Sequence, residues 1–271
     1  MDMAIPIRPE THFDFGRNWA AFAAELPEGA IDRASEGLDR LGLIDLASKT
    51  FLDIGCGSGI HAIAAMRRGA IATGIDVDRA SVDTANAMAR KVEAPAFAHQ
   101  RSILDPCISD LGKFDIVYSW GVLHHTGDVW RAIAAAAQLV ATGGTLAIAL
   151  YEETPFCALW TREKRFYTKA GPMKRALVRY PFGIARLLAS SVYRRENPVT
   201  VLRDYATDRG MDFWRDADDW LGGYPYQPTR AAEVIRFVES MDFQLVRKNV
   251  VRPQLGIFGT GCSEFMFCRS V

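Results

Sequence analysis

The sequence lacks paired cysteines, since its five cysteines are scattered and none belongs to a C-x-x-C pair. This scarcity argues against both a zinc site and a disulfide scaffold, and it favours a reducing, cytoplasmic location. The cysteines are Cys56, Cys107, Cys157, Cys262 and Cys268.

The chain also lacks net charge and long apolar runs. Lysines and arginines number 32, as do aspartates and glutamates. No global charge therefore attracts nucleic acid or an anionic membrane. No apolar run approaches the length of a membrane span, and residues 1–8 lack the apolar segment that a signal peptide needs. We expect no membrane partner and regard nucleic acid as disfavoured, while 271 residues suffice for one substantial core plus an insertion.

A glycine-rich segment, FLDIGCGSGI at residues 51–60, is the most informative part of the chain. The apolar run at 50–54 predicts a buried strand, and the residues from Ile60 onwards predict a helix. Glycines serve where the backbone takes positive φ or lies against a ligand. The dinucleotide fingerprint G-x-G-x-x-G would place its third glycine at position 60, whereas this chain has it at Gly59. The spacing therefore argues against a dinucleotide ligand.

Four later segments accompany this turn in a fixed order, at residues 74–78, 101–103, 114–125 and 142–151. Together with residues 53–59 they resemble the motifs of class I S-adenosylmethionine-dependent methyltransferases. A single glycine triplet would be a weak signal, whereas five segments in order are specific. The resemblance covers roughly residues 50–151.

The resemblance implies S-adenosyl-L-methionine as the cofactor. It places Asp53 near the amine end of that molecule and Asp76 at the ribose hydroxyls, and Ser102 stands where an Asp is commoner. Two alternatives stay open: Asp76 could merely cap the helix that starts near residue 78, and residues 119–120 could be ordinary packing. The expected cofactor-binding residues are Asp53, Gly55, Gly57, Asp76, Val77, Ser102, Ile103, Ser119 and Trp120.

Candidate catalytic residues follow the fourth and fifth strands. Methyl transfer proceeds in line with the carbon–sulfur bond, and positioning supplies much of its acceleration. A base is needed only for an acceptor that is protonated at rest. His124, ranked slightly ahead of His125, is the favoured base because imidazole titrates near neutral pH, with Tyr151 as a further catalytic candidate. Glu152 and Asp219 are secondary candidates, and the alternative is that the histidines only orient the following loop.

One departure concerns metal. The methylases of ubiquinone biosynthesis have a similar fourth motif that carries acids, where this chain has Gly121 and His124. Divalent ions of the hard type require oxygen ligands, so metal assistance is not implied and ubiquinone-type activity is disfavoured.

The order of elements predicts an α/β fold. Strands are expected near 50–54, 72–76, 95–99, 114–119 and 144–150, and helices near 59–68, 79–92 and 128–140. Thr229 is expected to cap a helix through Met241, before strands at 243–250 and 263–268. With the resemblance, this predicts a Rossmann-like seven-stranded class I methyltransferase sheet with an antiparallel last strand. The expected division is an N-terminal helical cap segment at 1–49, a cofactor-binding core at 50–151, a helical cap insertion at 152–228 and a closing helix and strands at 229–271.

The insertion is expected to be helical, with breaks at residues 171–172 and at Pro181. Its residues 160–196 contain ten lysines and arginines and only two acids. Such a cluster would attract an anionic substrate, an acidic partner or RNA. The favoured alternative is the solvated face of amphipathic helices whose other, packed face holds Phe166, Leu177, Leu187 and Leu188.

Aromatic segments flank the core at residues 12–19 and 209–226. With the segment GCSEF at 261–265, they resemble a subgroup of methyltransferases that act on small molecules. Large rings could wall off a reaction chamber, although a packing role is equally credible. The expected substrate-binding residues are Trp19, Asp219, Trp220 and Tyr224.

Three functions stay open on sequence grounds. The favoured one is methyl transfer to a small-molecule acceptor at an undetermined O, N, S or C atom. The others are a methyltransferase acting on RNA or protein, and a non-catalytic protein that binds S-adenosylmethionine. The number of subunits is not predicted.

Overall fold

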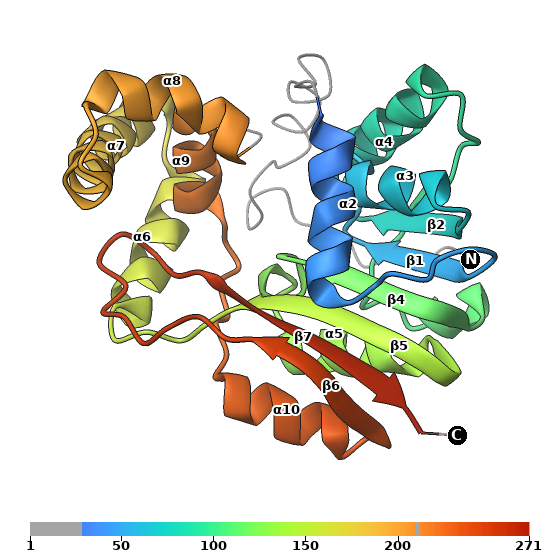
Figure 1. The fold of residues 1–271 in the computed structure, drawn as a ribbon. Coiled ribbons are helices and arrows are strands. Elements are labelled where there is room, and N and C mark those ends of the chain that lie inside the picture. Colours follow the sequence, from blue (N-terminus) through green and yellow to red (C-terminus); the bar gives the residue numbers. More distant parts are fainter. Residues whose placement is uncertain (1–28, 210–211, 271) are drawn as a thin grey trace.

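A seven-stranded sheet lies at the centre of the protein (Figure 1). The computed structural model describes residues 29–209 and 212–270. In the order β3-β2-β1-β4-β5-β7-β6, only β7 among the described strands runs antiparallel to its neighbours, β5 and β6, which confirms the predicted sheet. The strands are β1 (Thr50–Ile54), β2 (Ile71–Asp76), β3 (Ala98–Gln100), β4 (Phe114–Trp120), β5 (Val140–Tyr151), β6 (Phe243–Asn249) and β7 (Cys262–Arg269).

Two strands differ from their predicted bounds. The third begins at Ala98 rather than near residue 95, because the Asn86 side chain accepts hydrogen bonds from the Phe97 and Ala98 N–H groups. The fifth begins earlier than predicted, because Val140 pairs with Phe114 ahead of a register shift. Side-chain hydrogen bonds and strand register, rather than the local sequence pattern, therefore determine where these two strands begin.

Helices cover both faces of the sheet (Figure 1). Alternate residues of β1 pack on opposite faces of the sheet. Phe51 packs with helices α2, α3 and α4, whereas Leu52 and Ile54 pack with α5 and α10. These helices are α2 (Ala30–Leu41), α3 (Ile60–Arg67), α4 (Arg79–Lys91), α5 (Val129–Gln138) and α10 (Ala231–Glu239), and short 3-10 turns are η1 (Ile108–Leu111) and η2 (Leu123–His125).

The helix α10 does not start as predicted. Its N-cap is Arg230, without a side-chain hydrogen bond, and Thr229 is buried in a β-bridge with Glu152 instead. The Ala231 N–H at the helix start is bound by the Glu152 carboxylate at 3.1 Å. A long-range acid thus replaces the expected local cap.

Four helices between β5 and α10 form a separate group, which we call the cap (Figure 1). They are α6 (Cys157–Lys169), α7 (Pro172–Arg194), α8 (Pro198–Arg209) and α9 (Phe213–Gly222). The break at residues 171–172 is confirmed, because Pro172 begins α7. The prediction of a break at Pro181 is wrong, since α7 continues through this residue. Pro181 faces solvent, where water can donate a hydrogen bond to the helix carbonyl that proline leaves without a donor.

The predicted packed face of the cap helices is also wrong. Leu187 is buried, but Phe166, Leu177 and Leu188 are 51%, 70% and 52% exposed. The face that packs in α6 instead carries Trp160, Lys164 and Tyr167, and that of α7 carries Gly183 and Leu187. Burial in this part is therefore set by contacts between helices rather than by hydrophobicity alone.

Candidate functional site

The glycine-rich turn between β1 and α3 requires its glycines. Gly55, Gly57 and Gly59 have φ values of 71°, 52° and 76°. A Cβ on Gly55 would lie 2.4 Å from Val122 Cγ1, and one on Gly59 would lie 2.6 Å from Phe97 Cζ. The turn thus packs tightly between β2, β3 and the loop after β4.

The carboxylate of Asp76 at the end of β2 is bound to this turn. Its Oδ2 accepts a hydrogen bond from the Gly57 N–H at 3.0 Å, and its Oδ1 accepts one from the Asp78 N–H at 2.9 Å. Asp78, not Asp76, is the N-cap of α4, so the capping alternative for Asp76 is wrong. Burial raises the pKa of Asp76 to about 6. Each oxygen of a carboxylate has a second lone pair, which leaves Asp76 able to accept further hydrogen bonds.

Asp53 lies on β1 beside this carboxylate and is 3% exposed. Burial and then the charge of Asp76 raise the pKa of Asp53 to about 7, against a backbone hydrogen bond from Ala62 that lowers it. Two carboxyl groups therefore share a small, mostly dry space. A cationic group placed there would stabilise both ionised forms.

The residues expected at the adenine lie after β2 and β3. Ser102 Oγ accepts a hydrogen bond from the Leu104 N–H at 3.1 Å and so shapes the turn that follows β3. Ile103 is buried in the core below this turn, whereas Val77 is partly exposed.

The end of β4 carries one buried and one exposed site candidate. Ser119 is fully buried and donates to the Ile54 carbonyl at 3.0 Å, which ties the ends of β1 and β4 together. Trp120 is 42% exposed, and its Nε1 donates to Glu264 Oε1 at 2.9 Å. Glu264 also accepts from Asn249 at 3.1 Å. Sequence reasoning missed this acid, although a glutamate inside an apolar strand within the GCSEF segment was a signal for it.

His124 and His125 lie in η2 and stack against Tyr151 at the end of β5. The ring centroids of His124 and Tyr151 are 4.1 Å apart, and those of His125 and Tyr151 are 5.5 Å apart. His124 Nδ1 accepts from the Tyr151 N–H at 3.3 Å, so its proton lies on Nε2 when the ring is neutral. His124 is fully buried, and burial lowers its pKa well below the usual value. Burial likewise raises the pKa of Tyr151 far above its ordinary value.

The two histidine rings have opposite tautomers. His125 Nδ1 lies 2.6 Å from the Pro225 carbonyl oxygen, which can only accept, so Nδ1 carries the hydrogen. The proton-accepting nitrogen of the neutral His125 ring is therefore Nε2. Among the described residues, His124 Nε2 has no hydrogen-bond partner despite its burial.

The cap brings one predicted substrate residue, Trp220, to this group, while another, Tyr224, follows α9 and contacts α6. The ring of Trp220 lies 5.2 Å from that of Tyr151, and Tyr224 Oη accepts hydrogen bonds from Arg165 at 2.9 and 3.1 Å. Asp219 lies on α9 next to Trp220 and is partly buried. Trp19 falls outside the described residues.

Sequence reasoning also missed Lys164. It is fully buried, its Nζ lies 3.7 Å from the centroid of the Trp220 ring, and it donates to the Trp220 carbonyl. Burial lowers the pKa of Lys164 to about 7. The spacing of Trp160, Lys164 and Tyr167 places the lysine on the packed face of α6, which was the available signal.

Comparison with known proteins places this arrangement in a family. The family model described as a methyltransferase domain matches residues 26–191. The chain belongs to this methyltransferase family. A ubiquinone biosynthesis O-methyltransferase from Alkalilimnicola ehrlichii is 34% identical over 110 residues, covering 41% of this chain and 44% of that one. One from Pseudomonas paraeruginosa is 35% identical over 112 residues, covering 41% and 47%. The chain thus spans less than half the length of these curated relatives.

Among solved structures, the methyltransferase resembles the magnesium protoporphyrin IX methyltransferase from Synechocystis. The TM-score is 0.52 at 18% identity, covering 89% of this chain and 82% of that one. At this identity the likeness shows the shared class I fold.

None of the helices in residues 29–209 and 212–270 has the length and apolar character that crossing a bilayer requires. Within the same ranges, no three His, Cys, Asp or Glu side chains gather as metal ligands would.

Proposed function

We propose that this protein transfers a methyl group from S-adenosyl-L-methionine to a small-molecule acceptor. The observation that carries the proposal is the bond between the Asp76 carboxylate and the glycine-rich turn, beside the buried Asp53. This arrangement offers a close backbone approach, an acceptor pair for a ribose and a carboxylate for an amine.

The residues present fit this cofactor. When bound, S-adenosyl-L-methionine supplies an electrophilic methyl group on a sulfonium. Burial and the charge of Asp76 raise the pKa of Asp53, so an adjacent ammonium group of the cofactor would stabilise its ionised form. Asp76 keeps lone pairs for two ribose hydroxyls while it holds the turn in place. Residues 77 and 102–103 would border the adenine.

We assign different roles to Ser119 and Trp120, the two candidate cofactor-binding residues at the end of β4. Ser119 holds the ends of β1 and β4 through its bond to Ile54, so we give it a positioning role. Trp120, with its exposed ring at the end of β4, is placed to border the bound cofactor and the acceptor.

We assign the acceptor site to the region between the end of β5 and the cap. Tyr151, Trp220 and Tyr224 would wall it, with Asp219 at its border. The names of the curated relatives, ubiquinone biosynthesis O-methyltransferases, support an oxygen acceptor. The buried Lys164 supports an anionic acceptor, since it lies on the Trp220 ring.

If the acceptor requires a base, we assign that role to His125 rather than to His124. The Pro225 carbonyl orients the His125 ring and leaves Nε2 as its basic nitrogen. His124 is poorly suited to receive a proton because its Nδ1 already accepts from Tyr151 and its pKa is lowered by burial. Its Nε2–H would instead donate to an acceptor oxygen.

We also propose the division of labour expected from the sequence. Residues 50–151 would bind the cofactor, residues 152–228 would cover the acceptor, and residues 229–271 would close the sheet, after an N-terminal segment at 1–49. A cytoplasmic location stays a prediction.

Calorimetry with S-adenosylmethionine and S-adenosylhomocysteine tests the cofactor. The unmodified protein should bind both, and Asp76→Asn should weaken binding at least about tenfold, because an amide NH₂ cannot accept from Gly57 and the ribose. The matched control Asp78→Asn retains an N-cap acceptor for α4 and should leave the affinity unchanged. Absence of heat and of thermal protection with both ligands would overturn the proposal.

Release of S-adenosylhomocysteine with a panel of phenols, amines and thiols tests the acceptor. Turnover with one chemical class identifies the nucleophile. Turnover on RNA, together with RNA retention that falls steeply with salt, would favour the macromolecular alternative. Cofactor binding without turnover on any class would favour the non-catalytic one.

A further inference from the structure

The solvent-facing side of α7 is apolar along nearly its whole length. Met173, Leu177 and Val192 are 77%, 70% and 80% exposed. Ile184 and Leu188 lie between them and are half exposed. Spacings of four and seven residues put all five on one side of a helix. We call these five residues the α7 stripe.

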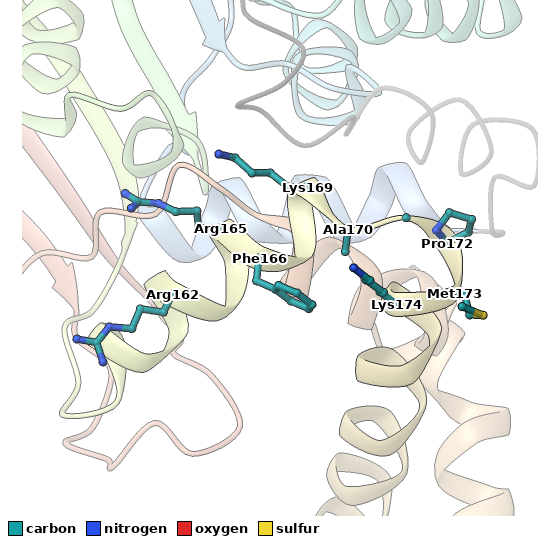
Figure 2. Close-up of a pocket in the computed structure, with 9 residues that line it drawn as sticks. Arg162, Arg165, Phe166, Lys169, Ala170, Pro172, Met173 and Lys174 are labelled. Atoms are coloured by element: carbon teal, nitrogen blue, oxygen red, sulfur yellow. The ribbon is translucent and has the colours of Figure 1, made fainter.

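Cationic side chains lie at the end of the stripe where α6 meets α7. A hollow there is lined by Arg162, Arg165, Lys169 and Lys174 together with apolar groups, of which Phe166 and Met173 are large and exposed (Figure 2). Met173 belongs both to the hollow and to the stripe, so the cationic and apolar surfaces are continuous.

The opposite end of the stripe is also cationic, because Arg194 and Arg195 are exposed where α7 ends. Residues 160–196 hold only two acids, Glu163 and Glu196. The carboxylate oxygens of Glu163 are buried. Glu196 is exposed beside Arg194 and Arg195. The neutral composition of the whole chain therefore hides a local surface that is apolar in the middle, strongly positive where α6 meets α7 and weakly positive at the other end.

The placement of charge decides between two occupants. A second copy would pair α7 with α7, and either direction of pairing would set cations against cations at the ends of the stripe. An anionic bilayer offers acyl chains to the stripe and phosphates to both cationic ends. The α7 helix has 23 residues, which gives it a length of about 34 Å.

We propose that the α7 stripe and the adjoining hollow dock on the surface of an anionic phospholipid membrane. The helix lies in the plane of the interface, its apolar side chains at the boundary between head groups and acyl chains. The hollow between α6 and α7 receives a lipid phosphate among Arg162, Arg165, Lys169 and Lys174. The proposal departs from the expectation, drawn from the neutral net charge, that the protein has no membrane partner. It concerns contact with a membrane surface, not a span, and does not depend on the methyl-transfer proposal.

Vesicle cosedimentation of the ligand-free full chain tests it. Vesicles of phosphatidylcholine and phosphatidylglycerol at about seven to three should bind the protein at least about tenfold more tightly than phosphatidylcholine alone, and added salt should weaken this binding. The double variant Leu177→Asp, Leu188→Asp should lose at least about tenfold in vesicle affinity, because both side chains would have to enter the apolar boundary.

Two variants control and extend the test. Ile44→Asp replaces a side chain that is 67% exposed outside the cap, and it should leave vesicle binding unchanged. Lys169→Glu, Lys174→Glu should weaken binding to anionic vesicles but not the residual binding to phosphatidylcholine. Unchanged circular dichroism and melting temperature show that each variant is folded.

Three results would overturn the proposal. The first is that the protein does not bind anionic vesicles at low salt, and the second is that it binds both vesicle types equally. The third is that Ile44→Asp and the variant Leu177→Asp, Leu188→Asp lose vesicle affinity to the same extent. A dimer in sedimentation velocity that dissociates in Leu177→Asp, Leu188→Asp would assign the stripe to a second copy instead. If the protein binds vesicles but neither S-adenosylmethionine nor S-adenosylhomocysteine, the membrane proposal is supported and the methyl-transfer proposal is contradicted.

Discussion

The sheet and the cap differ in which charged and apolar side chains they bury. Near the glycine-rich turn lie the buried acid Asp53 and the partly buried acid Asp76, and Asp76 is held by backbone N–H groups. In the cap the fully buried cation is Lys164, packed on an aromatic ring and next to the buried carboxylate of Glu163, while leucines of α7 lie in solvent. The first arrangement suits a ligand with a cationic end, and the second suits an anionic one. Under the proposed function, the two regions would divide the charges of donor and acceptor between them.

The largest expected effect concerns the turn itself. Gly59→Ala should lower the free energy of unfolding by about 3 kcal/mol, because it combines positive φ with overlap against Phe97 and Ala85. Gly121 has a similar φ of 75° but nothing within 4 Å of its added Cβ. Gly121→Ala should therefore cost only about 1 kcal/mol in urea denaturation. Equal losses in the two variants would show that backbone strain, not packing, makes glycine necessary.

The next prediction concerns Asp53. Its folded pKa of about 7 exceeds the ordinary value of 3.8, so the folded ligand-free protein binds more protons than the unfolded chain between these values. The stability contributed by this group is therefore lost as pH rises from about 4 through 7. Asp53→Asn should remove this dependence and raise the free energy of unfolding at pH 8 by about 2 kcal/mol, while weakening cofactor binding.

Urea denaturation from pH 5 to pH 8, with and without S-adenosylmethionine, checks this prediction. Leu52→Val, one residue earlier on β1, serves as a control that changes stability without changing its pH dependence. If Asp53→Asn kept the slope of the unmodified protein, the ionisation would have to be assigned to another group.

The difference between the regions also explains what could be predicted. Most strands and the glycine turn could be predicted from local pattern, because Gly55 and Gly59 have no room for a Cβ. The seven-stranded sheet with its antiparallel strand followed from the resemblance to a known family.

Hydrophobicity predicts the packed face of the cap wrongly, because Leu177 is exposed while Lys164 is buried. Only the spacing of Trp160, Lys164 and Tyr167 on α6 indicated that face. Contacts with Trp220 and neighbouring helices decide which face packs.

The same limit applies within the site. The positions of His124 and His125 after β4 are predictable, but their tautomers are not. They depend on the Tyr151 N–H and on the Pro225 carbonyl, which come from distant parts of the chain. Glu264, the partner of Trp120, likewise comes from a strand far along the sequence.

A third prediction tests the cap. Burial lowers the folded pKa of Lys164 below its ordinary 10.5, although the neighbouring Glu163 carboxylate raises it, so the cost of charging Lys164 is present at low pH and fades as pH rises toward 10.5. Lys164→Met keeps the stem that packs on Trp220 and should raise the free energy of unfolding by about 2 kcal/mol at pH 6, with a smaller gain at pH 9.

Calorimetry sharpens the comparison with Asp53. Lys164→Met should leave the affinity for S-adenosylmethionine unchanged while raising the KM of an anionic acceptor, whereas Asp53→Asn should weaken the donor. Loss of donor affinity in Lys164→Met would break the division between the two regions. Lys169→Met, an exposed lysine on the same helix, is the matched control for stability.

The smallest expected effect lies at Trp120, whose partner Glu264 belongs to the antiparallel strand β7. Trp120→Phe keeps an aromatic ring but removes the donor to Glu264. Because Trp120 is 42% exposed, water can replace the lost bond, and the free energy of unfolding should fall by only about 0.5 kcal/mol. A double-mutant cycle with Glu264→Gln measures this coupling directly in urea denaturation. A coupling above about 2 kcal/mol would mean that the ends of β4 and β7 form one polar network that reaches across β5.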